Sequence, residues 1–331
     1  MPTFQRDKTR SNFPDSLKVD KNEEVAVLTA NQVWGALRGL ETFSQLVFQP
    51  YLIRTASVED QPRFPHRGTL IDTGRHFLSL SIILQHLDVM SQNKMNVLHW
   101  HIVDSESFPY TSAKFPNISF QGAYTPAHIY SIADMRKVID YARLRGIRVV
   151  PEFDTPGHSG SWGQSIPNLL SQCYDSKGKI NQLPNIMDPT VPANFNFLSE
   201  FFEVSDAIAH VWKGNSVEAI REEMANVTAA GHFAILSSCW LNPFQARVLG
   251  GEAALWGEYV DGTNFMARMW PRASAVAERL WSNPEQTKSH GASWPRLHEF
   301  RCRMMNRGFA AQPPNAPDYC PFEWNPIYEE L

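Results

Sequence analysis

The chain has 331 residues, of which 43% are hydrophobic and 19% charged, so its length and composition suit one barrel-sized globular domain with a small appendage. Its formal net charge of −4 gives no electrostatic reason to expect nucleic acid or an anionic membrane as a partner. No run approaches the roughly 18 apolar residues of a membrane span, and the polar N-terminus shows no signal peptide.

Residues 1–66 are predicted to form a short unit of their own. Residues 24–28 are strand-like, and residues 31–46 carry apolar side chains at helical spacing. The prolines within residues 62–65 then mark a boundary. Because one strand and one helix cannot bury a core alone, we expect a truncated α+β remnant that leans on the rest of the chain.

From residue 67 to residue 331, strand-like and helical segments alternate. The predicted strands are residues 67–72, 96–104, 147–154, 209–212, 233–238 and 248–256. The predicted helices are residues 78–94, 131–145, 195–202 and 216–231, followed by two long helices at the C-terminus. The helix at residues 131–145 is predicted to begin with a Ser131-x-x-Asp134 capping box and to be closed by Gly146. This α/β alternation indicates a parallel sheet or a (β/α) barrel of TIM type. Since such a barrel closes with eight strands, six strands predict an incomplete one.

The four cysteines are too few for a disulfide scaffold. Cys302 and Cys320 enclose a 17-residue loop, and a bridge between them would stabilise the fold by about 3 kcal/mol. Free thiols in a reducing compartment are the alternative. The sequons at Asn117 and Asn226 are weak signs of a secretory route.

In parallel barrels the active site lies at the carboxyl ends of the strands. The predicted strand ends carry an arginine, carboxylates, a histidine, an amide and indoles: Arg75, Asp104, Asp154, His158, Trp212, Asn242, Trp256 and Glu258. Charged and amide groups bind hydroxyls, and indoles stack on the C–H surface of a sugar. Taken singly, such an aspartate is commonly a turn residue, such a tryptophan is commonly core, and Glu152 could pair with Arg148. Their arrival at one end of one sheet favours a pyranose site.

His99 and His101 form a pair that can bind zinc in metal-dependent barrel hydrolases, with His158 or an aspartate completing the set. Against this, Asp104 shares strand parity with Trp100 rather than with the histidines, and no later histidine cluster follows. We therefore expect no metal and no cofactor, and a zinc-dependent hydrolase remains a remote alternative.

Four longer motifs are specific. They are Arg67-Gly with Asp72-Thr-Gly-Arg75-His-Phe, Asn96-Val-Leu-His-Trp-His-Ile-Val-Asp104, Glu152-Phe-Asp-Thr-Pro-Gly-His158, and Gly250-Gly-Glu-Ala-Ala-Leu-Trp256-Gly-Glu258. Together they resemble the β-N-acetylhexosaminidases of glycoside hydrolase family 20, most closely the lysosomal-type animal enzymes. The resemblance runs from the N-terminal remnant to the Cys302 and Cys320 pair.

The resemblance implies removal of terminal β-linked N-acetylglucosamine or N-acetylgalactosamine with retention, in which the acetamido oxygen of the substrate attacks the anomeric carbon. It also implies a homo- or hetero-dimer and a lysosomal or secreted location. The roles it implies are catalytic shaping by Asp104 and His158 with Asp154 in support, hydroxyl binding by Arg75, Asn242 and Glu258, and pocket walls from Trp212 and Trp256.

The sequence also departs from the family pattern. The family carries its general acid and an orienting aspartate as an Asp-Glu pair in a His-x-Gly-Gly-Asp-Glu strand, and this string does not occur here. The next strand, the partner of Cys173 and the tyrosine near Trp240 are missing as well. Because a general acid supplies about 10² to 10⁴ in rate, we expect this chain to be impaired.

Two questions stay open at this stage. Glu203, Glu252 or Glu258 could replace the missing acid. The alternative to an enzyme is a non-catalytic remnant that binds sugar or pairs with another subunit.

Overall fold

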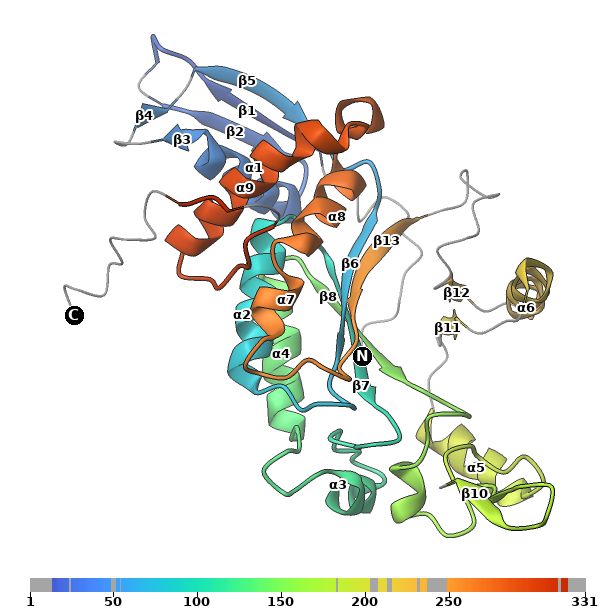
Figure 1. Ribbon diagram of the computed structural model, residues 1–331. Helices are drawn as coiled ribbons and strands as arrows, with labels where there is room; N and C mark the ends of the chain where they lie inside the picture. Colours follow the sequence, from blue (N-terminus) through green and yellow to red (C-terminus); the bar gives the residue numbers. More distant parts are fainter. Residues whose placement is uncertain are drawn as a thin grey trace. The chain divides into compact units, whose positions relative to one another are not determined.

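In the computed structural model the chain forms two compact units (Figure 1). The main unit comprises Lys8–Asp188 and Gly250–Leu331, and the small unit comprises Met1–Asp7 and Pro189–Leu249. The structure describes residues 14–23, 25–48, 52–53, 55–182, 184–202, 208–212, 216–230, 233–236, 249–314 and 317–320. Within these residues, no helix combines the length and the apolar character that crossing a membrane requires.

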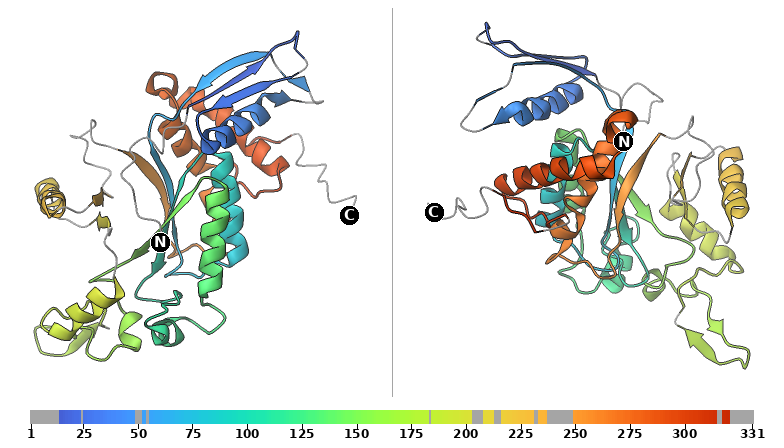
Figure 2. Two further views of the ribbon diagram at one scale, coloured as in Figure 1. Left: turned by 180° about the vertical axis from the view of Figure 1, so that it is seen from behind. Right: turned by 45° about the horizontal axis from the view of Figure 1, so that its top comes forward.

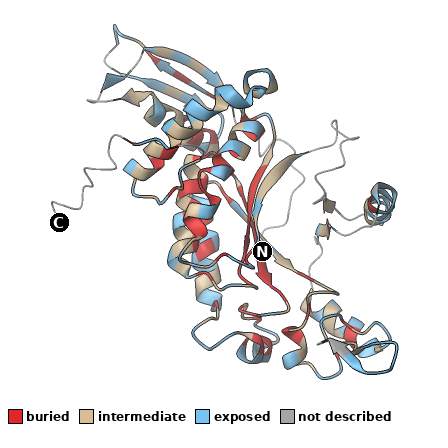
Figure 3. Ribbon diagram, viewed as in Figure 1, coloured by how far each residue is buried: buried red, intermediate tan, exposed pale blue. Residues whose placement is uncertain are grey.

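A four-stranded parallel sheet forms the centre of the main unit. Its order is β13 (Gly250–Leu255), β6 (His66–Asp72), β7 (Val97–Val103) and β8 (Arg148–Phe153). Helix α2 (Leu80–Gln92) connects β6 to β7, and α4 (Ile132–Leu144) connects β7 to β8. Figure 3 shows buried residues along β6, β7 and the adjoining helices. All seven residues of β7 are buried, so burial on both faces explains why this strand is apolar apart from two histidines.

The ends of α4 follow the sequence signals. The Ser131 side chain accepts a hydrogen bond from the Asp134 N–H, and the Asp134 carboxylate accepts one from the Ser131 N–H. This capping box satisfies backbone groups that a helix start leaves without partners. Gly146, with φ of 66°, ends the turn that follows the helix. The predicted capping box is confirmed.

An antiparallel sheet forms a second layer of the main unit. Its order is β2 (Val27–Ala30), β1 (Asp15–Val19) and β5 (Ala56–Asp60), and helix α1 (Val33–Leu46) lies along one face (Figure 2). The prediction of a single strand and a helix was wrong in number. Strands β1 and β5 are short and half polar, so they give no apolar run in the sequence. The boundary at residue 66 stays a prediction.

Arg38 of α1 fastens this layer to the helices of the parallel sheet. Its guanidinium donates to the carbonyl oxygens of Ser91, Met95, Arg145 and Gly146 at 3.0–3.3 Å. These carbonyls lie at or just beyond the carboxyl ends of α2 and α4, where unsatisfied oxygens and the helix dipole favour a cation. Burial lowers the pKa of Arg38 to about 10, so the side chain stays charged at neutral pH.

The rest of the main unit consists of helices and short pairings. The helical elements are α3 (Pro116–Gly122), η1 (Trp162–Gln164), α7 (Phe265–Met269), α8 (Arg272–Trp281), η3 (Pro284–Thr287) and α9 (His290–Asn306). The short strands are β3 (Val47–Phe48), β4 (Leu52–Ile53), β9 (Cys173–Tyr174) and β10 (Ile180–Gln182). The predicted disulfide is confirmed, with Cα atoms of Cys302 and Cys320 5.2 Å apart, while Cys173 is free within the described part of the chain.

The small unit contains α5 (Pro192–Phe201), β11 (Ile208–Val211), α6 (Val217–Ala229) and β12 (Phe233–Leu236). Strands β11 and β12 pair in parallel, and the Ser216 side chain caps α6 by accepting from the Ala219 N–H. All six predicted strands therefore occur as parallel strands, four in one unit and two in the other. Neither parallel sheet closes on itself within the described residues, and the incomplete barrel stays a prediction.

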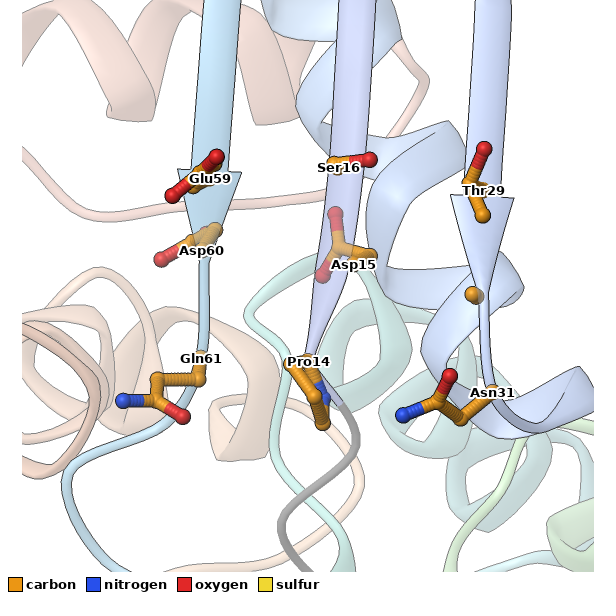
Figure 4. Close-up of a pocket in the computed structure, with 9 residues that line it drawn as sticks. Pro14, Asp15, Ser16, Thr29, Asn31, Glu59, Asp60 and Gln61 are labelled. Atoms are coloured by element: carbon orange, nitrogen blue, oxygen red, sulfur yellow. The ribbon is translucent and has the colours of Figure 1, made fainter.

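Asp15 is a buried carboxylate on the central strand of the N-terminal sheet. It is 4% exposed, and neither carboxylate oxygen has a hydrogen-bond partner among the described residues. Figure 4 shows it between Asp60 of β5 and Thr29 of β2. Gly39 of α1 makes room for it, because an added Cβ would lie 2.8 Å from Oδ2. Burial raises the pKa of Asp15 to about 6, with Lys94 opposing and Asp60 adding to the shift.

Stability should therefore fall when Asp15 ionises. Its pKa is higher in the folded state than in the unfolded chain, so the folded state loses stability as pH rises through about 6. We expect Asp15→Asn to unfold like the wild type at pH 4 and to be more stable by on the order of 1 kcal/mol at pH 7.5. Thermal and urea unfolding at both pH values measure this. The control Glu59→Gln changes an exposed neighbour, and equal pH profiles for all three proteins would contradict the prediction.

Candidate active site

Arg75 follows β6 and is surrounded by acidic and imidazole groups. Its Nη1 lies 2.9 Å from Asp72 Oδ2, and its Nη2 lies 2.9 Å from Asp104 Oδ2 and 3.0 Å from His158 Nδ1. Burial opposes the charge, but the hydrogen bond that Arg75 donates to Asp72 and the negative charges of Asp72 and Asp104 outweigh burial and raise the pKa of Arg75. Arg75 is thus a permanent cation in a fixed orientation.

The turn after β6 places this arginine. Asp72 Oδ1 accepts hydrogen bonds from the backbone N–H groups of Gly74 and Arg75 at 3.0 and 3.2 Å, and Oδ2 accepts one from Gly257 after β13. Gly74 is required here because an added Cβ would lie 2.6 Å from the backbone nitrogen of Asp104. The close approach of the two loops brings Arg75 within reach of Asp104.

Asp104 follows β7 and is 1% exposed. Its Oδ2 lies 2.9 Å from His101 Nε2, and its Oδ1 accepts from the Ser105 N–H. Burial raises the pKa of Asp104, but His101, Ser105 and Arg75 together lower it. The strand-parity argument that separated Asp104 from the histidines was wrong, because a register shift between His101 and Val103 ends the regular alternation of β7.

Asp154 and His158 follow β8 and complete the cluster. His158 Nδ1 lies 3.1 Å from Asp104 Oδ1 and 3.7 Å from Asp154 Oδ2. His158 has φ of 56°, a conformation that is uncommon for a residue with a Cβ and recurs at functional sites. Burial raises the pKa of Asp154, whereas that of Asp104 is lowered. Neighbouring carboxylates with opposite shifts are suited to different roles.

Trp256 follows β13 and forms an open wall beside this cluster. Its side chain is 38% exposed, the guanidinium carbon of Arg75 lies 5.4 Å from its ring centroid, and His101 packs edge-on at 5.0 Å. Exposed indoles of this kind offer a surface on which a sugar ring can stack. Glu258, two residues further on, is exposed and adds to the negative field at Arg75.

A row of alternating histidines and glutamates continues from the cluster along one face of the sheet. His101 Nδ1 lies 3.3 Å from Glu152 Oε2, which lies 2.8 Å from His99 Nε2, and His99 Nδ1 lies 2.7 Å from Glu252 Oε2. Glu252 Oε1 in turn lies 2.7 Å from His66 Nε2. Imidazole and carboxylate groups thus alternate from His101 to His66.

This row favours a structural role for the histidine pair over zinc ligation. Burial opposes their protonation, but the neighbouring carboxylates raise the pKa of His99 to about 9 and that of His101 to about 10. A doubly protonated imidazole has no lone pair for a metal.

The comparisons with known proteins agree with the arrangement of these motifs. The sequence matches the profile of "Glycosyl hydrolase family 20, catalytic domain" over residues 64–218 and 210–284, more than half of the chain. The profile "beta-acetyl hexosaminidase like" matches residues 16–46. The chain belongs to glycosyl hydrolase family 20.

Beta-hexosaminidases are among the proteins of similar sequence. The chain is 42% identical to Beta-hexosaminidase A of Caenorhabditis briggsae, with 93% of this chain and 77% of that protein covered. It is 41% identical to Beta-hexosaminidase subunit beta of Homo sapiens, with 91% and 72% covered.

Solved family 20 structures share the fold. The Flavobacterium johnsoniae chitobiase superposes with a TM-score of 0.73 at 24% identity. The superposition includes 89% of this chain and 60% of the chitobiase chain. The family 20 β-N-acetylhexosaminidase of Streptomyces coelicolor gives a TM-score of 0.74 at 19% identity, with 92% and 84% covered. The α/β fold of the chain is therefore that of family 20 catalytic domains.

The candidate site of the main unit brings together six of the residues predicted from sequence: Arg75, Asp104, Asp154, His158, Trp256 and Glu258. Trp212 belongs to the small unit and is 40% exposed, and Asn242 lies outside the described residues, so both stay predictions. Sequence reasoning missed Glu106 and Tyr124, which contact the side chain and the carbonyl of Arg75. Glu106 lies only two residues after Asp104, whereas Tyr124 has no signal in the sequence.

The histidine–glutamate row predicts a loss of stability at alkaline pH. Because the folded pKa values of His99 and His101 lie above the usual 6.5, their stabilisation is complete below about pH 6.5 and is lost as pH rises through about 9 to 10. We expect Glu252→Gln to lower the free energy of unfolding by about 1–3 kcal/mol at pH 6.5 and to reduce this alkaline loss. Thermal unfolding from pH 6 to 10.5 measures both effects. Glu278→Gln, which removes an exposed ion pair with Arg296, is the control. An alkaline profile that is the same in all three proteins would refute the prediction.

Proposed function

We propose that this chain is a β-N-acetylhexosaminidase of family 20 that retains the part of the site holding the terminal sugar but is strongly impaired in hydrolysis. The scaffold's reaction is removal of terminal β-linked N-acetylglucosamine or N-acetylgalactosamine by substrate-assisted retaining hydrolysis. Asp104 and His158, supported by Asp154, shape and polarise the site. Arg75 binds ring hydroxyls, and Trp256 lines the pocket.

The observation that carries this proposal is the fixed cation at the strand ends. Arg75 is held by Asp72 and Asp104 at 2.9 Å and lies against the partly exposed indole of Trp256. A preoriented guanidinium beside an aromatic face combines hydroxyl recognition with stacking, the two interactions that a pyranose requires. We assign Glu258 to an outer hydroxyl, and Trp212 and Asn242 to the same pocket by resemblance to the family.

Three observations support the loss of the general acid. The sequence contains no His-x-Gly-Gly-Asp-Glu string. The family 20 profile matches in two segments that overlap at residues 210–218, as expected when an intervening stretch is absent. The match to the Caenorhabditis briggsae protein spans 430 positions, so at least 99 of them (430 less 331) have no residue in this chain.

Glu252 is a poor replacement for that acid. Burial raises its pKa, but hydrogen bonds from His66 and His99 outweigh burial and lower the pKa to about 2. A carboxylate held ionised between two histidines has no proton to donate near neutral pH. Glu258 is exposed, and Glu203 lies outside the described residues.

A second candidate function is a non-catalytic protein that binds sugar or pairs with another subunit. It is favoured by a retained pocket without an acid, and several relatives carry the word subunit in their names. Homo- or hetero-dimers fit either function. The Cys302–Cys320 disulfide supports a lysosomal or secreted location, because such bonds persist in oxidising compartments.

Turnover and binding separate these alternatives. We expect the purified 331-residue chain to hydrolyse a nitrophenyl N-acetyl-β-glucosaminide at least about 10²-fold more slowly than a complete family 20 enzyme. We expect saturable binding of an N-acetylglucosamine thiazoline. Binding should be lost in Arg75→Ala and kept in the control Arg143→Ala, which changes an exposed arginine of α4. Family-like turnover would refute the impairment, and absence of thiazoline binding would refute the sugar site. Stoichiometric zinc in the purified protein would favour the remote metal-dependent alternative.

A further inference from the structure

Glu106 lies at the mouth of the Arg75 site, in the loop after β7. Its side chain is 50% exposed, and its Oε2 lies 3.6 Å from Arg75 Nε. The other two nitrogens of that guanidinium already face Asp72 and Asp104 at 2.9 Å. Within the described part of the chain, the Nε–H has no partner within hydrogen-bond distance, and it faces Glu106.

The 3.6 Å separation is too long for a direct N–H···O hydrogen bond. A hydroxyl oxygen placed between the two groups can accept from Nε and donate to the carboxylate at ordinary lengths of about 2.8 Å. Arginine supplies no acceptor and an ionised carboxylate supplies no donor, so only the pair satisfies both sides of a hydroxyl. Arg75 and Glu106 thus form a donor–acceptor pair with room for one hydroxyl.

The same carboxylate makes the mouth acidic. Asp72 and Asp104 already neutralise the charge of Arg75, and Glu258 is a further exposed carboxylate beside it. Burial and the nearby Asp104 raise the pKa of Glu106, which reflects the density of negative charge at this point. An anionic substituent on the bound sugar would approach like charges here at close range.

We propose that Glu106 is a specificity-determining residue that binds one ring hydroxyl together with Arg75 and selects neutral terminal hexosamines over sulfated ones. This inference rests on the proposed function of the Arg75 site. It adds a determinant that the motifs do not include, because Glu106 lies between the second and third motifs of the sequence.

Titration calorimetry of the full chain tests the two parts separately, with N-acetylglucosamine and its 4-O-sulfate and 6-O-sulfate as ligands. We expect Glu106→Gln to weaken N-acetylglucosamine binding about tenfold, because one hydrogen bond to a charged acceptor is lost. The preference for the neutral sugar over at least one sulfate should fall by a similar factor. Glu106→Asp keeps the charge but shortens the reach, so it should keep the discrimination against sulfate and lose affinity for the neutral sugar. Glu285→Gln, an exposed surface change, should behave as the wild type.

The outcomes are distinct. If the wild type binds N-acetylglucosamine and Glu106→Gln binds all three sugars as the wild type does, the role of Glu106 is overturned while the sugar site stands. If the wild type binds none of them, both the inference and the proposed function fall. If Glu106→Asp loses the preference for the neutral sugar over the sulfated sugars to the same extent as Glu106→Gln, the negative charge of Glu106 is not the cause of the selection.

Discussion

A largely buried guanidinium needs acidic partners, and Arg75 obtains them from several strand ends at once. Asp72 is the last residue of β6, Asp104 follows β7, and His158 follows β8, while the backbone N–H of Gly257 after β13 donates to Asp72. The contacts of Arg75 and Asp72 therefore link the carboxyl ends of all four strands of the parallel sheet. The sheet positions the site residues, and their hydrogen bonds and ion pairs hold the strand ends together.

The ion pairs do not stop at the site. From Asp104 they pass through His101, Glu152, His99 and Glu252 to His66 at the opposite end of the sheet. Each buried charge in this row is compensated by a neighbour of opposite sign, as burial of charge requires. The row also explains why the histidine pair is held protonated, and why Glu252 is unsuited to proton donation.

Periodic burial and turn chemistry were readable in the sequence. They predicted the six parallel strands, the capping box at Ser131 and the convergence of Arg75 with the aspartates. Strands β1 and β5 were missed because each buries only one face and has no apolar run. The relation of Asp104 to His101 was misread because a register shift interrupts strand parity, which no local pattern encodes. Tyr124 was missed because its contact with Arg75 joins residues 49 positions apart.

The proposed function rests on the idea that the site still recognises a sugar after its general acid is lost. A crystal structure of the 331-residue chain with an N-acetylglucosamine thiazoline bound decides this. The predicted result is a sugar ring against Trp256 with a ring hydroxyl within hydrogen-bond distance of Arg75. A ligand bound elsewhere, or crystals in which no ligand lies at Arg75 although the ligand is present at saturating concentration, would contradict the proposal.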